Sequence, residues 1–245
     1  MEKSKVIKIK KRIDGAEYPF VVIKNENELD NKLLARIKKE LDLINKKGCV
    51  IYSRKIIKNE NNLIRKYDNK KYKIRIAYLI NKKEIKWTPR CLDENEFEFF
   101  RFKKLKSLEK FCIKLYNNYC KKWSKKKNYS EFAKEKKAIK KMFEILKYDY
   151  LAIKKREIEV FVILYFNIPA YNDKYCDLIG HIEISNDIEK EKRKRIHEFI
   201  KYWLYKNSKS DYIVAEVDCF NIRSQKFFRK MGFKPKWLAF IKENF

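Results

Sequence analysis

The alternation of apolar and polar residues predicts an α+β chain whose longest series of elements lies in the C-terminal part. Apolar and β-branched runs, typical of buried strands, occur at Tyr150–Ile153, Ile158–Asn167, Tyr175–Ser185 and Tyr212–Val217. Apolar residues three and four positions apart predict amphipathic helices between several of these runs. The helix that follows Lys190–Arg195 is expected to face inward with Ile196, Phe199, Ile200, Trp203 and Leu204. From residue 97 onward the predicted order is β-α-α-β-β-β-α-β-α-β, which favours a mixed sheet covered by helices.

The first ninety residues predict a smaller α+β domain. Its patterns are strands at Tyr18–Ile23, Cys49–Tyr52 and Lys71–Ile80 and a helix at Asn27–Lys46. Pro89 favours an extended predecessor, and an acidic cluster follows it at Asp93–Glu98, where the sign of the charge switches. We therefore expect an N-terminal domain of residues 1–90 and a second domain of residues 97–245.

The chain is strongly basic, with 62 Lys and Arg against 33 Asp and Glu and a formal charge of +29. A charge of this size attracts RNA, DNA or another polyanion. The lysine run Lys121–Lys127 contains Trp123, and cations beside an aromatic ring suit phosphate contacts and base stacking. An AT-rich genome that enriches lysine throughout explains the composition equally well, so both readings stay open.

Several classes of protein are excluded or disfavoured by single residue types. The 4 glycines form neither a Walker loop nor a Rossmann fingerprint. The 6 cysteines form no C-x-x-C pair, which favours packed thiols in a reducing, cytoplasmic setting. With only 2 histidines, we expect no metal site. The N-terminus lacks a signal-peptide pattern and the run Val160–Ile168 is too short to span a bilayer, so we expect a soluble chain without a membrane partner.

The stretch Asp211–Phe233 carries the most information. After the strand Tyr212–Val217, Asn221 is placed to cap a helix, and Gly232 is placed to end it in a left-handed conformation. The residues expected on the inward side of this helix are Ile222, Phe227, Phe228 and Met231. The spacing reads Asn, small residue, aromatic pair, Gly-Phe, at Asn221, Ser224, Phe227, Phe228, Gly232 and Phe233.

This spacing resembles the C-terminal motif of the GNAT superfamily, the acetyl-CoA-dependent N-acetyltransferases. In that family an Asn and a small residue precede a Tyr, and the segment ends in Gly-Phe; here Phe228 stands at the Tyr position. The predicted order of elements after residue 97 is similar to the GNAT fold, whereas the resemblance does not extend to residues 1–90. Without the resemblance, the stretch is an ordinary strand-helix-strand unit.

The resemblance implies a site for acetyl-CoA as co-substrate. The strands Tyr175–Ser185 and Tyr212–Val217 would part, and backbone at Ile182 and Ile184 would pair with the pantetheine arm and polarise the thioester. The phosphates would meet the start of the next helix. The residues expected around the co-substrate are Ile182, Ile184, Arg193, Lys194, Arg195, Ile196, Asn221, Ser224 and Phe228. The two glycines of the family's phosphate loop are missing, so the basic side chains would hold the phosphates, or they form only a solvated basic turn.

The acceptor amine must lose a proton before it attacks, which requires a base or a water chain. Glu183 and Asp177 are the candidate catalytic carboxylates on the strand beside the thioester, although either is also typical of a solvent-facing position. On the same strand, His181 is interpreted as a packing residue, and Gly180 is expected to mark a bulge or a close backbone approach. Two functions follow: an N-acetyltransferase acting on an amine of a nucleic-acid-associated or acidic partner, or a catalytically inactive GNAT-like module that binds nucleic acid or protein.

Overall fold

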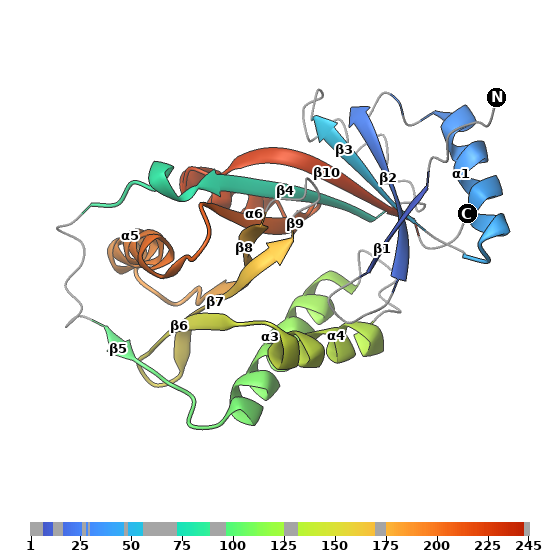
Figure 1. The fold of residues 1–245 in the computed structure, drawn as a ribbon. Helices are drawn as coiled ribbons and strands as arrows, with labels where there is room; N and C mark the ends of the chain where they lie inside the picture. Colours follow the sequence, from blue (N-terminus) through green and yellow to red (C-terminus); the bar gives the residue numbers. More distant parts are fainter. Residues whose placement is uncertain are drawn as a thin grey trace. The chain divides into compact units, whose positions relative to one another are not determined.

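The computed structural model describes residues 7–11, 17–25, 28, 30–46, 49–55, 73–88, 97–124, 132–169 and 175–242. The chain divides into two compact units, which we call unit 1 (residues 1–80 and 214–245) and unit 2 (residues 81–213). Figure 1 shows the elements of both units. The mixed α+β class predicted from the sequence is confirmed, because strands and helices both occur throughout the described residues.

Unit 1 combines strands from both ends of the chain. Its elements are β1 (Lys8–Lys11), β2 (Glu17–Asn25), α1 (Asn31–Leu43), β3 (Cys49–Lys55), β4 (Lys73–Asn81), most of β9 (Tyr212–Asp218), α6 (Ile222–Lys230) and β10 (Lys234–Lys242). The strand order is β1-β2-β3-β10-β4-β9, so β10 lies between two N-terminal strands. β10 pairs antiparallel with both β3 and β4, whereas β2 and β3 are parallel.

Unit 2 contains the series of elements predicted after residue 97, up to the start of β9. It begins with the 3-10 helix η2 (Lys82–Glu84) and continues with β5 (Glu98–Phe99), α3 (Leu105–Ser124), α4 (Phe132–Ile145), β6 (Tyr148–Lys154), β7 (Ile158–Pro169), β8 (Tyr175–Ile184) and α5 (Lys190–Asn207). The order β5-β6-β7-β8 makes an antiparallel sheet. Residues Val160–Leu164 of β7 are almost completely buried, as expected for a central strand covered on both faces.

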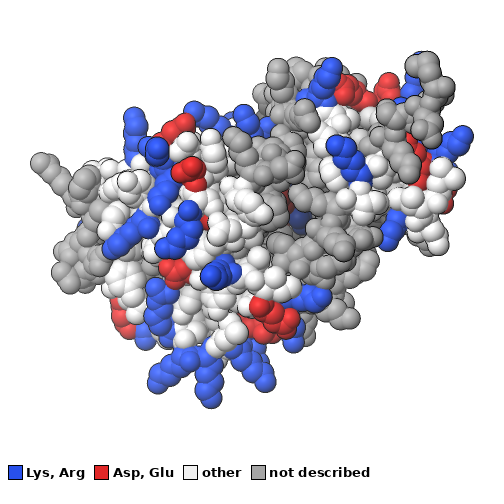
Figure 2. Space-filling view, in the orientation of Figure 1, with Lys and Arg blue, Asp and Glu red and all other residues white. Residues whose placement is uncertain are grey.

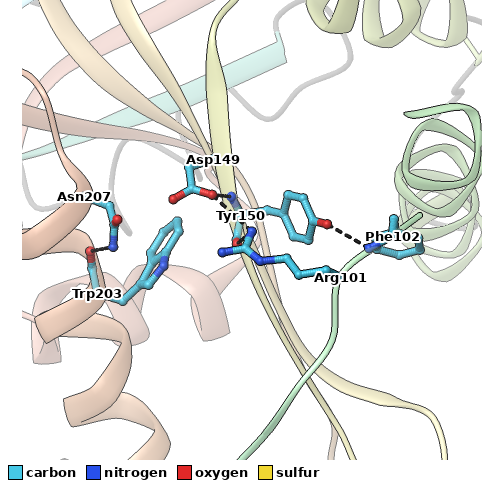
Figure 3. Close-up of polar contacts among 6 residues, drawn as sticks. All are labelled: Arg101, Phe102, Asp149, Tyr150, Trp203 and Asn207. Carbon is cyan, nitrogen blue, oxygen red and sulfur yellow. Dashed lines mark hydrogen bonds and ion pairs between the residues drawn. The ribbon is translucent and has the colours of Figure 1, made fainter. Parts of the chain in front are cut away.

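Helices cover both faces of the unit 2 sheet. Phe111 of α3 packs against Phe161 of β7 with ring centroids 5.1 Å apart, and Phe143 of α4 packs against Tyr165 at 6.1 Å. In Figures 1 and 3, α5 lies on the opposite side of β6 from α3. The inward side of α5 is the predicted one, with Ile196, Phe199, Ile200, Trp203 and Leu204 buried.

The two compact units do not coincide with the division predicted at residues 90–97. The C-terminal strand β10 pairs with β4 from Lys234 opposite Leu79 to Ile241 opposite Lys73. The C-terminal strand β10 therefore shares a sheet with N-terminal strands. Residues 89–96, which contain the predicted boundary, lie outside the described residues, and an independently folding domain of residues 1–90 stays a prediction.

Candidate functional site

The strand β8 is interrupted at Gly180. In its pairing with β7, Ile163 lies opposite His181 and the next residue, Leu164, lies opposite Ile179, so Gly180 is left over as a bulge. A Cβ atom at Gly180 would lie 2.3 Å from Cε2 of Tyr165, which no side chain tolerates. Of the two expectations for this glycine, the bulge is confirmed, whereas the atoms that approach it belong to side chains and not to backbone. The bulge changes the direction of β8 just before His181 and Glu183, of which Glu183 is a candidate catalytic residue.

His181 and Glu183 follow the bulge on one face of β8, because residues two apart in a strand share a face. Glu183 lies opposite Phe161, whose ring packs on α3, so both side chains belong to the α3 side of the sheet. Nε2 of His181 lies 3.5 Å from Oε2 of Glu183, and the Glu183 side chain is 56% exposed. That imidazole nitrogen is buried without a hydrogen bond of good geometry. The carboxylate and the imidazole therefore form a pair that sequence reasoning treated as unrelated residues.

Asp177, the other candidate carboxylate, has a different environment. Its side chain is 0% exposed and accepts five hydrogen bonds. The donors are the hydroxyls of Ser208 and Ser210 and the backbone N–H groups of Asn167, Lys209 and Ser210. Burial alone would raise its pKa, but the hydrogen bonds favour the ionised form and hold the pKa below its usual value of 3.8. This geometry favours a structural role for Asp177, which ties the segment after α5 to β7 and β8.

The predicted basic turn at residues 193–195 is wrong, since α5 begins at Lys190 and these residues lie within it. The guanidinium of Arg193 reaches back to the preceding loop, and its Nη2 donates to the carbonyls of Ser185 (3.1 Å), Asn186 (2.7 Å) and Ile188 (3.2 Å). Arg193 thus closes the β8–α5 loop, and its expected contact with a phosphate stays a prediction. The loop shape depends on it, because a guanidinium can serve several carbonyls at once.

The other basic residues of this segment are oriented differently. Lys194 is exposed and pairs with Glu191 at 2.8 Å, Arg195 is exposed, and Ile196 is completely buried in the core. The N-cap residue Glu189 makes no side-chain capping bond, so the first N–H groups of α5 have no cap. An uncapped helix start favours an anion through its dipole and its N–H groups.

The C-terminal motif lies in unit 1. Asn221 caps α6, accepting a hydrogen bond from the N–H of Ser224 at 3.2 Å, and Gly232 has φ of 92°, so both predictions are confirmed. Phe228 is buried, and its ring stacks on that of Tyr78 with centroids 6.1 Å apart. Ile222, predicted to face inward, is 38% exposed. The ring beside Phe228 that carries a hydroxyl is that of Tyr78. It belongs to β4, which is not part of the motif from Asn221 to Phe233.

Thiol chemistry is disfavoured at the described cysteines. Cys49, Cys112, Cys176 and Cys219 are buried thiols outside any disulfide, as predicted for small packing residues. Burial raises the pKa of Cys112 to about 12, which keeps it protonated and unreactive at neutral pH. The described residues also hold no group of three or more His, Cys, Asp or Glu suited to a metal ion.

Replacing Gly180 by alanine is expected to destabilise the protein by about 1–3 kcal/mol, because the new methyl group overlaps the buried Tyr165 ring. Chemical denaturation measures this directly. In a Tyr165→Leu background the same substitution should cost clearly less, since the ring is gone. Equal costs in the two backgrounds would contradict the proposed overlap.

The fold and site together define a mixed α+β protein with a bulged strand leading to an uncapped helix. Comparison with protein families and with curated proteins finds no match. A functionally unknown conserved protein from Staphylococcus epidermidis matches at 10% identity over 100% of this chain and 94% of its own, with a TM-score of 0.57. A conserved protein of unknown function from Bacteroides thetaiotaomicron matches at 10% identity over 98% and 86%, with a TM-score of 0.50.

A GCN5-related N-acetyltransferase from Sphaerobacter thermophilus matches at 10% identity over 97% of this chain and 76% of its own, with a TM-score of 0.44. At these identities, and at that TM-score, the matches say nothing about function. Among the described helices, none combines the length and the apolar character needed to cross a membrane.

Proposed function

We propose that the chain is an acyl-CoA-dependent N-acyltransferase with acetyl-CoA as its co-substrate. The observation that carries the proposal is the bulged strand β8, which presents His181 and Glu183 and then leads into the uncapped start of α5. The motif from Asn221 to Phe233 supports it, because the cap and the glycine stop have the geometry that the spacing requires. The parting of β8 from β9 stays a prediction.

In this mechanism Glu183 takes the proton from the acceptor amine, directly or through a water molecule. The amine nitrogen then bonds to the acyl carbon, the carbon–sulfur bond breaks, and the sulfur leaves as a thiolate. Acetyl-CoA supplies the activated acyl group. His181 lies beside this carboxylate, with Nε2 3.5 Å from Oε2 and without a hydrogen bond, and in this proposal it positions Glu183 by close contact. Phe228 provides no proton for the thiolate, which at a usual thiol pKa near ~8.5 leaves without one.

In this proposal, backbone N–H groups rather than side chains bind the phosphates of acetyl-CoA. The uncapped N–H groups at the start of α5 provide donors and the positive end of the helix dipole. Arg193 donates to the loop carbonyls, and it stays a prediction as a phosphate contact, as do Lys194 and Arg195. The role of Ile182 and Ile184 along the pantetheine arm also stays a prediction.

A thermal-shift experiment tests the proposal. A ligand at about 100 times its Kd adds ~2.7 kcal/mol to stability, which for this size of chain raises Tm by roughly 5–10 °C. We expect acetyl-CoA and coenzyme A to produce such a shift. ATP is the control, because a chain of charge +29 also binds polyanions without specificity.

The competing function is a catalytically inactive module with the same fold. It is favoured by Phe228 at the Tyr position and by the engagement of Arg193 with its own loop. This alternative predicts no shift with millimolar acetyl-CoA, or a shift that ATP reproduces in full. Either result would overturn the acyltransferase proposal.

A further inference from the structure

Five aromatic rings of unit 2 form a continuous row, which we call the aromatic row. Successive centroids are 4.4 Å apart for Tyr205–Trp87, 5.8 Å for Trp87–Tyr202, 6.1 Å for Tyr202–Phe199 and 5.5 Å for Phe199–Phe99. Both ends reach solvent, since Tyr205 is 38% exposed and Phe99 is 42% exposed. Trp87 and Tyr202 between them are half-buried, and Phe199 is 3% exposed, so the row joins the core to the surface at its two ends.

Two lysines lie over the row. Nζ of Lys82 is 5.6 Å from the Tyr205 ring centroid, and Nζ of Lys206 is 5.5 Å from that of Tyr202. Within the described part of the chain, neither lysine forms an ion pair with a carboxylate; Lys82 donates to the carbonyl of Ser208 at 2.7 Å. The charge of these ammonium groups is thus left for another partner.

Glu198, one of the acidic residues near the row, is already paired. Glu198 pairs with Lys201 at 2.6 Å and accepts a hydrogen bond from the N–H of Thr88 at 3.0 Å. Its negative charge therefore opposes an incoming anion only weakly. On the face that Figure 2 shows, blue lysine and arginine side chains cover more of the described surface than red acidic ones.

A hollow of about 230 Å³ adjoins the row and shares Phe99, Phe199 and Tyr202 with it. Its remaining side includes Arg101, Trp203 and Asn207, which Figure 3 shows together. Nη1 of Arg101 donates to the carbonyl of Tyr150 at 2.8 Å and lies 3.2 Å from Asp149. Because one nitrogen makes both contacts, Nε and Nη2 of Arg101 keep donors for a ligand.

We propose that the aromatic row and its hollow bind single-stranded nucleic acid. The exposed rings of Tyr205 and Phe99 stack bases, and Lys82 and Lys206 contact phosphates. The hollow takes one unstacked base with Arg101 as a donor to its edge. Aromatic rings with lysines beside them suit single-stranded nucleic acid, because each nucleotide carries a base and a phosphate. A duplex offers phosphates but hides its base faces. This inference is independent of the acyltransferase proposal.

Fluorescence anisotropy with labelled oligonucleotides of about ten residues tests the inference. The probes are oligouridylate, oligothymidylate and a duplex of the same length, so the two single strands show whether the sugar matters. We expect either single strand to bind about tenfold more tightly than the duplex, with affinity falling steeply as salt rises.

Variants separate the aromatic row from general electrostatics. Tyr205→Ala and Lys206→Gln should each weaken binding about fivefold or more, whereas Tyr205→Phe should keep it. The matched control is Lys104→Gln with Lys106→Gln, two exposed lysines at the start of α3, where Figure 2 shows a group of blue side chains. We expect less than a twofold change there. Because Tyr205 and Lys206 are exposed, folding should be unaffected, and circular dichroism checks this.

Two results would overturn the inference. One is a duplex that binds as tightly as both single strands. The other is a Tyr205→Ala protein that binds like the α3 control variant, which would leave only nonspecific attraction by the net charge. The shift of Tm with acetyl-CoA should persist in Tyr205→Ala, so failure of one proposal does not imply failure of the other.

Discussion

Replacing Asp177 by asparagine is expected to destabilise the protein by about 3–5 kcal/mol, a large fraction of the stability of a typical domain. The carboxylate accepts five hydrogen bonds while completely buried. An amide nitrogen would turn one accepting oxygen into a donor that faces other donors, leaving buried N–H groups unsatisfied. Urea denaturation at pH 7 measures the loss. Asp211→Asn, at an exposed aspartate of the same unit, is the control and should stay within about 0.5 kcal/mol.

The same substitution predicts a pH dependence. The pKa of Asp177 is below its usual value of 3.8, so its ionised form contributes stability above that pH. This contribution is lost as the pH falls through the lowered pKa of the folded state. The difference in stability between wild type and Asp177→Asn should therefore be largest near pH 7 and shrink below pH 4. A difference that is constant down to pH 3 would contradict the assignment.

Replacing Glu183 by glutamine is expected to lower kcat by about 10²–10⁴, because the amide cannot take the acceptor's proton. The side chain is 56% exposed and paired with His181, so little stability should be lost. Release of the coenzyme A thiol, measured with spermidine and with a lysine-containing peptide as acceptors, gives the rate. The KM for acetyl-CoA should change little, since Glu183 is assigned to proton transfer and not to binding.

The control for this prediction is Glu157→Gln, an exposed glutamate in the β6–β7 turn. It should retain full activity. His181→Gln should reduce kcat less than Glu183→Gln does, because it removes only the residue that positions the carboxylate. If Glu183→Gln keeps wild-type kcat while acetyl-CoA still raises Tm, the fold binds the co-substrate but Glu183 is not the base.

The parts of the site that depend on neighbours along the chain were predicted correctly. Asn221 caps its helix, Gly232 ends it with a positive φ, and Gly180 marks a bulge. Each of these follows from the conformational preferences of one residue and the few around it. The candidates on β8 were also placed correctly on one strand, since alternation defines its faces.

The roles of these candidates required the tertiary structure. From the sequence, Asp177 and Glu183 were equivalent candidate carboxylates. In the structure, Asp177 accepts hydrogen bonds from Ser208 and Ser210, some thirty residues away in the chain, whereas Glu183 is exposed. The sequence predicted a phosphate ligand at Arg193 but did not indicate that its guanidinium donates to carbonyls of the preceding loop. No local pattern reports such contacts, because the partners meet only after the chain has folded.

By itself, the sequence determined the order of strands and helices, the buried face of α5 and the cap and stop of α6, because periodicity and residue preference act over a few positions. The tertiary structure decided that β10 pairs between β3 and β4, that Asp177 is locked in hydrogen bonds, and that Tyr205, Trp87 and Phe99 belong to one row. These features depend on contacts between residues far apart in the chain, whose burial and pairing are set by the packing of the whole unit.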